Sequence, residues 1–121
     1  MGLLDRSALR RSQKLIAPFA EDGEEAIDFD VGRVGVMEVD LIATERALYV
    51  APKGLTDVRR LPYKDMAEVM WMQIGSSRSA DWILGVALAP NAAGESLQVQ
   101  VEIRAPRGLG RLVEERAGSA D

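Results

Sequence analysis

Carboxylates are the most concentrated chemically capable side chains in this sequence, and they cluster between Glu21 and Asp40. Two carboxylates facing each other across a pocket could act as the general acid and base of a hydrolase. Asp28 and Asp30, however, alternate with Ile27 and Phe29, which predicts that the two acids lie on the solvated side of a strand. The acids also lack the spacing of a calcium-binding loop. The pattern therefore favours a solvated strand face over an acid–base pair or a metal site.

The sequence contains no cysteine and no histidine. This excludes disulfides, thiolate nucleophiles, Cys/His zinc sites and every mechanism that uses imidazole. No pairing of a nucleophile with a base remains. We therefore expect a protein that is not an enzyme, with no catalytic residue, no metal and no cofactor.

Charge is unevenly distributed along the 121 residues, whose net charge is −4. Residues 1–20 carry a net +3, and residues 21–45 carry a net −8. An acidic total without a basic stripe interleaved with aromatic residues predicts that nucleic acid is not a partner. The basic residues of the N-terminal segment are Arg6, Arg10, Arg11 and Lys14.

These basic residues alternate with leucines in residues 1–20, so the segment could form an amphipathic helix at a membrane surface. The favoured alternative is an arm that packs on its own domain or on a neighbouring chain. The adjacent acidic stretch would attract such an arm and would oppose an anionic membrane. Leu9, Ile16 and Phe19 are the residues expected to supply its apolar contact.

Two further interaction candidates are Trp71 and Arg78. Trp71 lies in "MWMQ", where Met70 and Met72 fall on the opposite strand face, so one of the two faces holds large apolar groups to be covered. Cover by the arm or the terminal helix is the favoured interpretation, and a surface for a partner or for self-association is the alternative. Arg78 lies in "GSSRSAD", whose amides could cradle a phosphate, but no helix follows it and a plain loop is favoured.

The elements that must position these residues are mostly short strands. A chain of this length is most simply one domain. The clearest strand alternates Leu97, Val99, Val101 and Ile103 with polar residues, which predicts an antiparallel strand with one buried face. Turn signals separate seven predicted strands, over residues 26–30, 36–43, 46–51, 56–63, 67–74, 82–89 and 97–104.

Two helices are predicted at the ends of the chain. The first spans residues 7–17, with Ser7 as its cap and Pro18 as its end. The second follows Pro106 and ends at Gly118, and its apolar face is formed by Leu109, Leu112 and Val113. The sequence shows neither a signal peptide nor a membrane span, so we expect a cytoplasmic location.

About seven antiparallel strands followed by one helix resemble the order of a bacterial pleckstrin-homology-like (PH-like) domain. "LIATERALYV" followed by "RRLPYKDMAEV" is similar to that family's pattern of strand, Thr, charged pair, strand and Pro-Tyr-x-Asp-Met. The matching residues are Thr44, Glu45, Arg46, Leu48, Pro62, Tyr63, Asp65, Met66 and Val69.

The resemblance implies a mainly β fold: a barrel of about seven antiparallel strands over residues 21–121, capped by the C-terminal helix and preceded by the arm of residues 1–20. It implies that the Thr44 hydroxyl satisfies a hairpin turn and that Asp65 does similar work at the next corner. Many members bind inositol phosphates through basic residues that flank the loop between the first two strands. Here that region offers only Arg33, so no inositol phosphate is expected.

We therefore expect a non-enzymatic binding module that recognises a protein partner or self-associates. The alternative is a peripheral membrane-binding domain that uses the basic arm.

Overall fold

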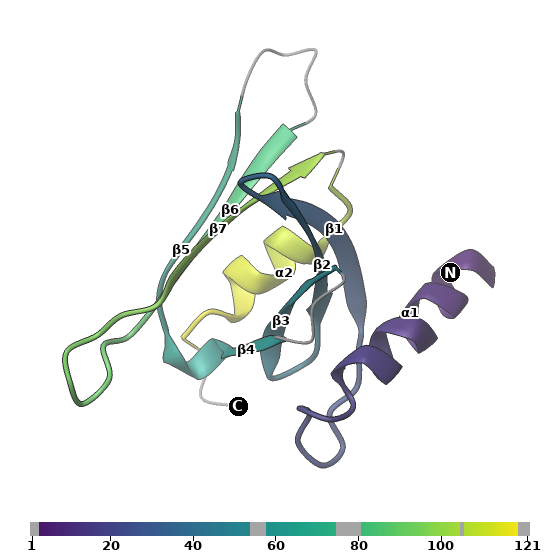
Figure 1. The fold of residues 1–121 in the computed structure, drawn as a ribbon, viewed down its shortest axis with the longest axis horizontal. Helices are drawn as coiled ribbons and strands as arrows, with labels where there is room; N and C mark the ends of the chain where they lie inside the picture. Colours follow the sequence, from purple (N-terminus) through teal and green to yellow (C-terminus); the bar gives the residue numbers. More distant parts are fainter. Residues whose placement is uncertain (1–2, 54–57, 75–80, 105, 119–121) are drawn as a thin grey trace.

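The computed structural model describes residues 3–53, 58–74, 81–104 and 106–118, with the side chains of residues 3–5 excepted. The described chain is mainly β, with one helix near each end (Figure 1). Its elements are α1 (Leu3–Ile16), β1 (Asp28–Val34), β2 (Met37–Ala43), β3 (Ala47–Pro52), β4 (Arg59–Pro62), the short 3-10 helix η1 (Tyr63–Asp65), β5 (Met66–Gln73), β6 (Asp81–Leu88), β7 (Gln98–Arg104) and α2 (Leu109–Arg116).

All seven strands of the described chain belong to one antiparallel sheet in the order β4-β3-β2-β1-β7-β6-β5. The sheet therefore consists of two meanders, β1 to β4 and β5 to β7, which meet where β1 pairs with β7. β4 and β5 are its two edges, and η1 connects them. The sheet curves around α2 without closing into a barrel (Figure 1). The predicted mainly β fold, with antiparallel strands and a helix at each end, is confirmed, whereas the predicted closed barrel is not observed in the described residues.

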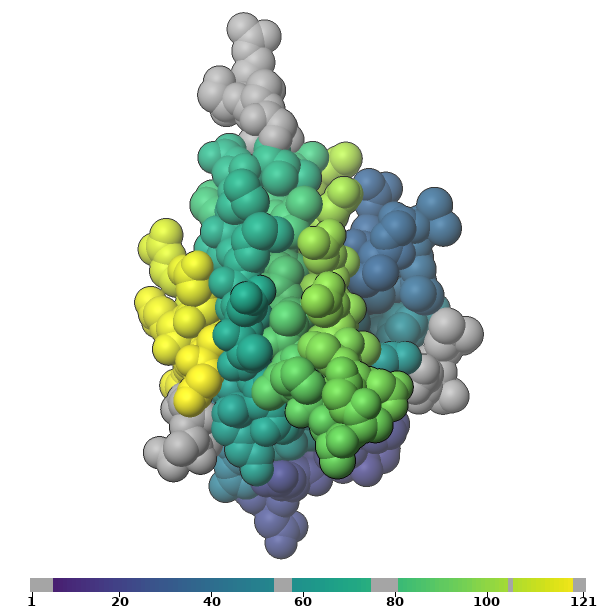
Figure 2. Space-filling model, turned by 90° about the vertical axis from the view of Figure 1, so that its left-hand side faces the viewer, coloured from purple at the N-terminus to yellow at the C-terminus, as the bar shows by residue number. Residues whose placement is uncertain are grey.

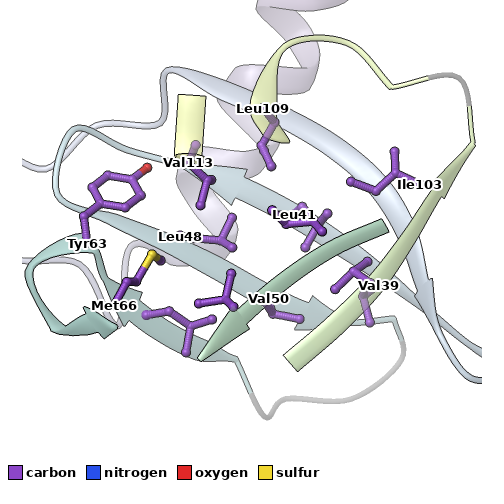
Figure 3. Packing of buried hydrophobic residues seen from close by; sticks show 14 residues of the cluster. Val39, Leu41, Leu48, Val50, Tyr63, Met66, Ile103, Leu109 and Val113 are labelled. Carbon is purple, nitrogen blue, oxygen red and sulfur yellow. The ribbon is translucent and has the colours of Figure 1, made fainter. Parts of the chain in front are cut away.

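The main core lies between the inner face of the sheet and α2 (Figure 3). Val101 and Ile103 of β7 are buried there, while Gln100 and Glu102 are exposed, which confirms the predicted alternation of that strand. From α2, Leu109 and Val113 are fully buried, whereas Leu112, expected to share this role, is only half-buried. The helix approaches β5 closely at Gly110, where a Cβ atom would lie 2.5 Å from the Trp71 ring.

A second, smaller core lies on the outer side of the sheet, where α1 ends. Ile16 is fully buried against Ile42 of β2 and against Ala47 and Tyr49 of β3. The arm is therefore a helix that contacts the sheet of its own chain, and Ile16 supplies the contact as expected. Leu9 is only half-buried, and the expectation for Phe19 is wrong because it is 42% exposed.

The predicted boundary of the first helix is also wrong, because α1 begins at Leu3 and Ser7 lies inside it rather than at its cap. No helix in the described part of the chain is long and apolar enough to cross a membrane.

The strand faces of β1 differ from the prediction. Asp30 is buried at 7% exposure, while Val31 is 44% exposed, so Asp30 does not lie on a solvated face. Both Asp30 carboxylate oxygens accept backbone N–H groups, from Val31 at 2.9 Å and from Arg107 at 3.1 Å. These bonds allow a carboxylate to occupy an inward position. β1 also continues past the predicted end at residue 30 and includes Gly32. A side chain is disfavoured at this position because a Cβ atom would lie 2.7 Å from the Glu102 carbonyl oxygen.

Candidate interaction surface

The Thr44–Glu45–Arg46 triplet forms the β2–β3 turn, as expected. The Thr44 hydroxyl oxygen accepts the backbone N–H groups of Arg46 and Ala47, both at 3.1 Å. The Tyr63 hydroxyl donates to the Thr44 carbonyl at 2.8 Å. At the next corner the expectation for the Asp65 side chain is not met: that side chain is exposed, and the backbone carbonyl of Asp65 accepts the Ala89 N–H at 2.7 Å.

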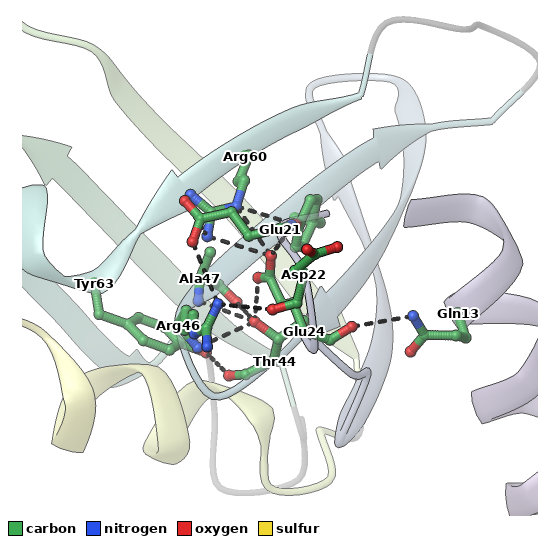
Figure 4. Close-up of polar contacts among 10 residues, drawn as sticks. Gln13, Glu21, Asp22, Glu24, Thr44, Arg46, Ala47, Arg60 and Tyr63 are labelled. Atoms are coloured by element: carbon green, nitrogen blue, oxygen red, sulfur yellow. Dashed lines mark hydrogen bonds and ion pairs between the residues drawn. The ribbon is translucent and has the colours of Figure 1, made fainter. Parts of the chain in front are cut away.

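Thr44 also belongs to a buried polar network centred on Glu24, in the segment between α1 and β1 (Figure 4). The Glu24 carboxylate accepts hydrogen bonds from the Thr44 hydroxyl at 2.5 Å and from the Tyr49 hydroxyl at 2.8 Å. It also forms an ion pair with Arg60 at 3.3 Å, and its side chain is 0% exposed. On the other side, the Gln13 amide of α1 donates to the Glu24 carbonyl and accepts the Ala26 N–H.

The protonation of this network is fixed at neutral pH. Burial alone would raise the pKa of Glu24, but the hydrogen bonds from Thr44, the Glu21 N–H and Tyr49, with the charge of Arg60, hold that pKa below its ordinary value. Burial, and then the Glu24 carboxylate, raises the pKa of Tyr49 to about 12. Glu24 therefore stays ionised and Tyr49 neutral, as expected for a network that holds α1 and the α1–β1 segment to the sheet.

The interaction candidates named from the sequence do not converge. Arg6, Arg10, Arg11 and Lys14 are all exposed along α1. Trp71 lies half-buried on the inner side of β5, where its ring stacks on Trp82 at a centroid distance of 4.7 Å and contacts α2. Arg78 lies outside the described residues. Arg33, the single basic residue of the β1–β2 region, forms an exposed ion pair with Glu102 at 3.4 Å.

A hollow of about 710 Å³ lies between the start of β1, the β5–β6 strands and the start of α2. The Trp71–Trp82 stack forms one wall. Its charged residues are of both signs: Asp28, Arg107, Arg111 and Glu115. Because these charges are mixed, the hollow does not favour a ligand of one charge.

The outer face of β5, β6 and β7 carries Met70 and Met72, which the arm or the terminal helix was expected to cover. Met70 is 39% exposed and Met72 is 47% exposed, and neither helix of the described residues lies over this face (Figure 2). Beside Met70 is a shallow hollow of about 570 Å³, whose floor includes Gly85 and Ala87. The expectation that the arm or the terminal helix covers these methionines is therefore wrong, because α1 lies on the other half of the sheet and α2 on the inner side.

The two edges of the sheet differ in protection. β4 has four residues, of which Arg59 and Arg60 are charged and the last is Pro62. Short length, positive charge and proline are the usual devices that stop an edge from pairing with another chain. β5 has eight residues with one charge, Glu68, and neither lysine nor proline. The β5 edge and the exposed Met70 and Met72 beside it are called the β5 surface below.

The sequence matches no family model and no curated protein. Among solved structures, the chain is similar to the C-terminal domain of an unknown protein from Leishmania infantum, with a TM-score of 0.57 and 12% sequence identity. The match covers 88% of this chain and 95% of that domain. At this level of identity the similarity shows a shared fold and nothing about function.

Proposed function

We propose that the chain is a non-enzymatic interaction module on a PH-like framework, and that it binds a protein through the β5 surface. Two meanders that meet at β1 and β7, with a C-terminal helix inside the curve, support the framework. The Thr44 turn and the Pro62–Tyr63 corner, which carry the sequence resemblance, support it as well.

The observation that carries the proposal is the state of β5. Exposed methionines are adaptable apolar contacts, and an unprotected strand edge offers backbone groups to a partner strand. Both lie together on β5, while the β4 edge carries protective residues.

The buried acids support a binding role over a catalytic one. The Glu24 carboxylate accepts bonds from Thr44, Tyr49 and Arg60, and the Asp30 carboxylate accepts two backbone N–H groups. Both groups are engaged in holding segments of the fold together, so neither is positioned to exchange protons with a substrate.

The test is quantitative affinity capture with the wild-type chain, Met72→Glu and Val36→Glu. Val36 is fully exposed in the β1–β2 turn and serves as the matched control. We expect Met72→Glu to lose at least one protein that wild type and Val36→Glu both retain, which can be this chain itself. Equal retention by all three would refute the β5 surface as the binding site.

A second candidate function, peripheral membrane binding, is favoured by the exposure of α1 and the turn after it. Leu15 is 38% exposed and Phe19 is 42% exposed, close in sequence to the exposed Arg11 and Lys14. Sedimentation with anionic and neutral vesicles tests this candidate. Pelleting of the wild type with anionic vesicles that is lost in a Leu15→Glu/Phe19→Glu variant would support it. Recovery of the wild type and the variant in the supernatant in equal amounts would refute it.

A further inference from the structure

We propose that the partner at the β5 surface is a second copy of this chain, with the two β5 strands paired antiparallel about a two-fold axis at Met70. The inference rests on the proposed function in taking the β5 surface as the contact. It goes further in naming the partner and the strand register.

The backbone N–H and C=O groups at the outer edge of β5 are placed where a second β5 strand could pair with them. The Ile74 N–H donates to the Asp81 carbonyl of β6 at 3.0 Å, and the β5–β6 register pairs Met70 with Gly85. Hydrogen-bonding direction alternates along an antiparallel strand. Met70 and Met72 therefore direct their backbone groups toward β6, and Val69 and Trp71 direct theirs to the outer edge.

An axis at Met70 places Val69 of each copy opposite Trp71 of the other. Both residues direct their N–H and C=O groups to the edge, so these two pairs can exchange hydrogen bonds. Met70 then lies opposite Met70 of the second copy in a non-hydrogen-bonded pair, where side chains approach most closely. Met70, whose side chain is 39% exposed in the single chain, is thereby buried against Met70 of the second copy.

Two registers give the longest overlap of the two β5 strands, one with the axis at Val69 and one with the axis at Met70. Charge repulsion favours the second. Glu68 is the single charge on β5. An axis at Val69 would leave the two Glu68 residues only two positions apart, about 7 Å along the strand, whereas an axis at Met70 separates them by four positions, about 13 Å. In the Met70 register, Glu68 lies opposite Met72 of the second copy.

A second copy suits this surface because β5 is self-complementary. A partner strand must offer a free edge, a low charge and apolar side chains on the outer face, and β5 itself has all three. Pairing of one surface with itself about a two-fold axis closes after two chains, which is the commonest form of protein assembly. α2 lies on the inner side, against Trp71, so the added strand extends the sheet without entering the core.

Introduced lysines test the register, because the same substitution has opposite expected effects at two neighbouring exposed methionines. Met70→Lys places two positive charges directly opposite each other, and we expect at least a tenfold loss of self-association. Met72→Lys places the lysine opposite Glu68 of the second copy, and we expect equal or tighter self-association. A surface for an unrelated apolar partner would be weakened by both changes.

Cysteine substitution gives an independent readout, because the chain contains no cysteine. A non-hydrogen-bonded pair has its Cα atoms about 4.5 Å apart, within the range of a disulfide. Met70→Cys should therefore cross-link under mild oxidation to twice the 13.2 kDa of one chain. Met72→Cys is the control: its side chain is the more exposed of the two, but it would lie about 13 Å along the strand from its counterpart, and it should remain monomeric.

An edge of eight residues buries less than a standard interface of ~1,600 Å², so self-association should be reversible and is best measured by analytical ultracentrifugation up to about 100 µM. A monomer throughout that range, or cross-linking of Met72→Cys in preference to Met70→Cys, would overturn the proposal. If the wild type is a monomer and Met72→Glu still loses a different protein in the capture experiment, the second-copy inference fails and the proposed function stands. If capture also shows no difference, both fail.

Discussion

The two meanders of the sheet have similar inner faces and very different outer faces. Behind β2 and β3, the outer side is covered at the end of α1, where Ile16 is fully buried and Glu24 joins a polar network with Tyr49. Behind β5, β6 and β7, the outer side exposes Met70 and Met72 next to a shallow hollow.

The two outer faces therefore differ in how much their residues contribute to the stability of the fold. The inner core contains residues from both meanders and from α2, so the curved sheet is stabilised without cover on either outer face. The outer cover behind β2 and β3 adds to that stability, whereas the exposed methionines add little. Their exposure is instead explained by the proposed interaction at β5.

The largest expected effect compares one aspartate substitution on each outer face. Ile16→Asp places a charge in a fully buried site and should lower the free energy of unfolding by at least about 3 kcal/mol. Met72 lies on the exposed face, so Met72→Asp should lower the free energy of unfolding by less than about 1 kcal/mol. Urea unfolding at low micromolar concentration measures both. Similar costs would mean that α1 is not docked.

The next effect concerns Glu24, whose carboxylate holds the α1–β1 segment to the outer side of the sheet. Glu24→Gln removes the charge that Arg60 pairs with and disturbs the acceptors used by Thr44 and Tyr49, so we expect a loss of about 2–4 kcal/mol. The control is Glu21→Gln, which removes an exposed partner of the same arginine and should cost less than about 1 kcal/mol.

The pH dependence of the Glu24 contribution has a definite sign. The pKa of Glu24 is lower in the folded protein than its ordinary value of 4.5. Its contribution is therefore complete above that ordinary value and is lost as the pH falls through the folded pKa. The difference between wild type and Glu24→Gln should shrink on acidification, and a difference that grows would contradict the network.

A smaller effect compares two strand glycines, one in each meander. Gly32→Ala would bring a Cβ to 2.7 Å from the Glu102 carbonyl oxygen, which is held in the sheet, and should cost about 1–3 kcal/mol. Gly85→Ala on the exposed side would meet the flexible end of Met70 at 3.3 Å. Because Met70 can move, the change should be within about 0.5 kcal/mol of wild type. Thermal unfolding of the two variants tests this, and equal losses would mean that the exposed face is packed as rigidly as the core.

The smallest expected effect is at Asp30. Burial raises the pKa of this carboxyl above its ordinary value of 3.8, despite its hydrogen bonds to the Arg107 and Val31 N–H groups. A raised carboxyl pKa means that stability decreases as the pH rises from that ordinary value through the folded pKa. Asp30→Asn should lack this decrease, so its melting temperature relative to wild type should rise across the interval. A constant difference would show that Asp30 does not titrate differently in the folded chain.

Parts of the fold that depend on one local pattern could be predicted from the sequence. β7 alternates Val101 and Ile103 with polar residues because one of its faces is buried and the other is solvated. The Thr44 turn was also predictable, since its hydroxyl oxygen accepts the N–H groups of Arg46 and Ala47, two and three residues away.

Features that depend on distant segments could not be predicted in this way. Asp30 occupies an inward position because the Arg107 N–H, 77 residues away, satisfies its carboxylate. Glu24 was one of nine acids in a segment that looked uniformly solvated, and only the fold brings Tyr49 and Arg60 to it. The exposure of Met72 likewise followed from where α1 and α2 pack, which the period of a single strand does not specify.

The pairing of β1 with β7 has a consequence for folding kinetics. Neighbours within each meander are consecutive in sequence, so these hairpins can form by closing short loops. The β1–β7 ladder instead joins Arg33 to Glu102, 69 residues apart, and must close a long loop before its contacts form. We therefore expect the ordering of this ladder to limit the folding rate. Substitutions along it should slow refolding more than they accelerate unfolding, whereas substitutions at the β5 edge should leave the refolding rate unchanged.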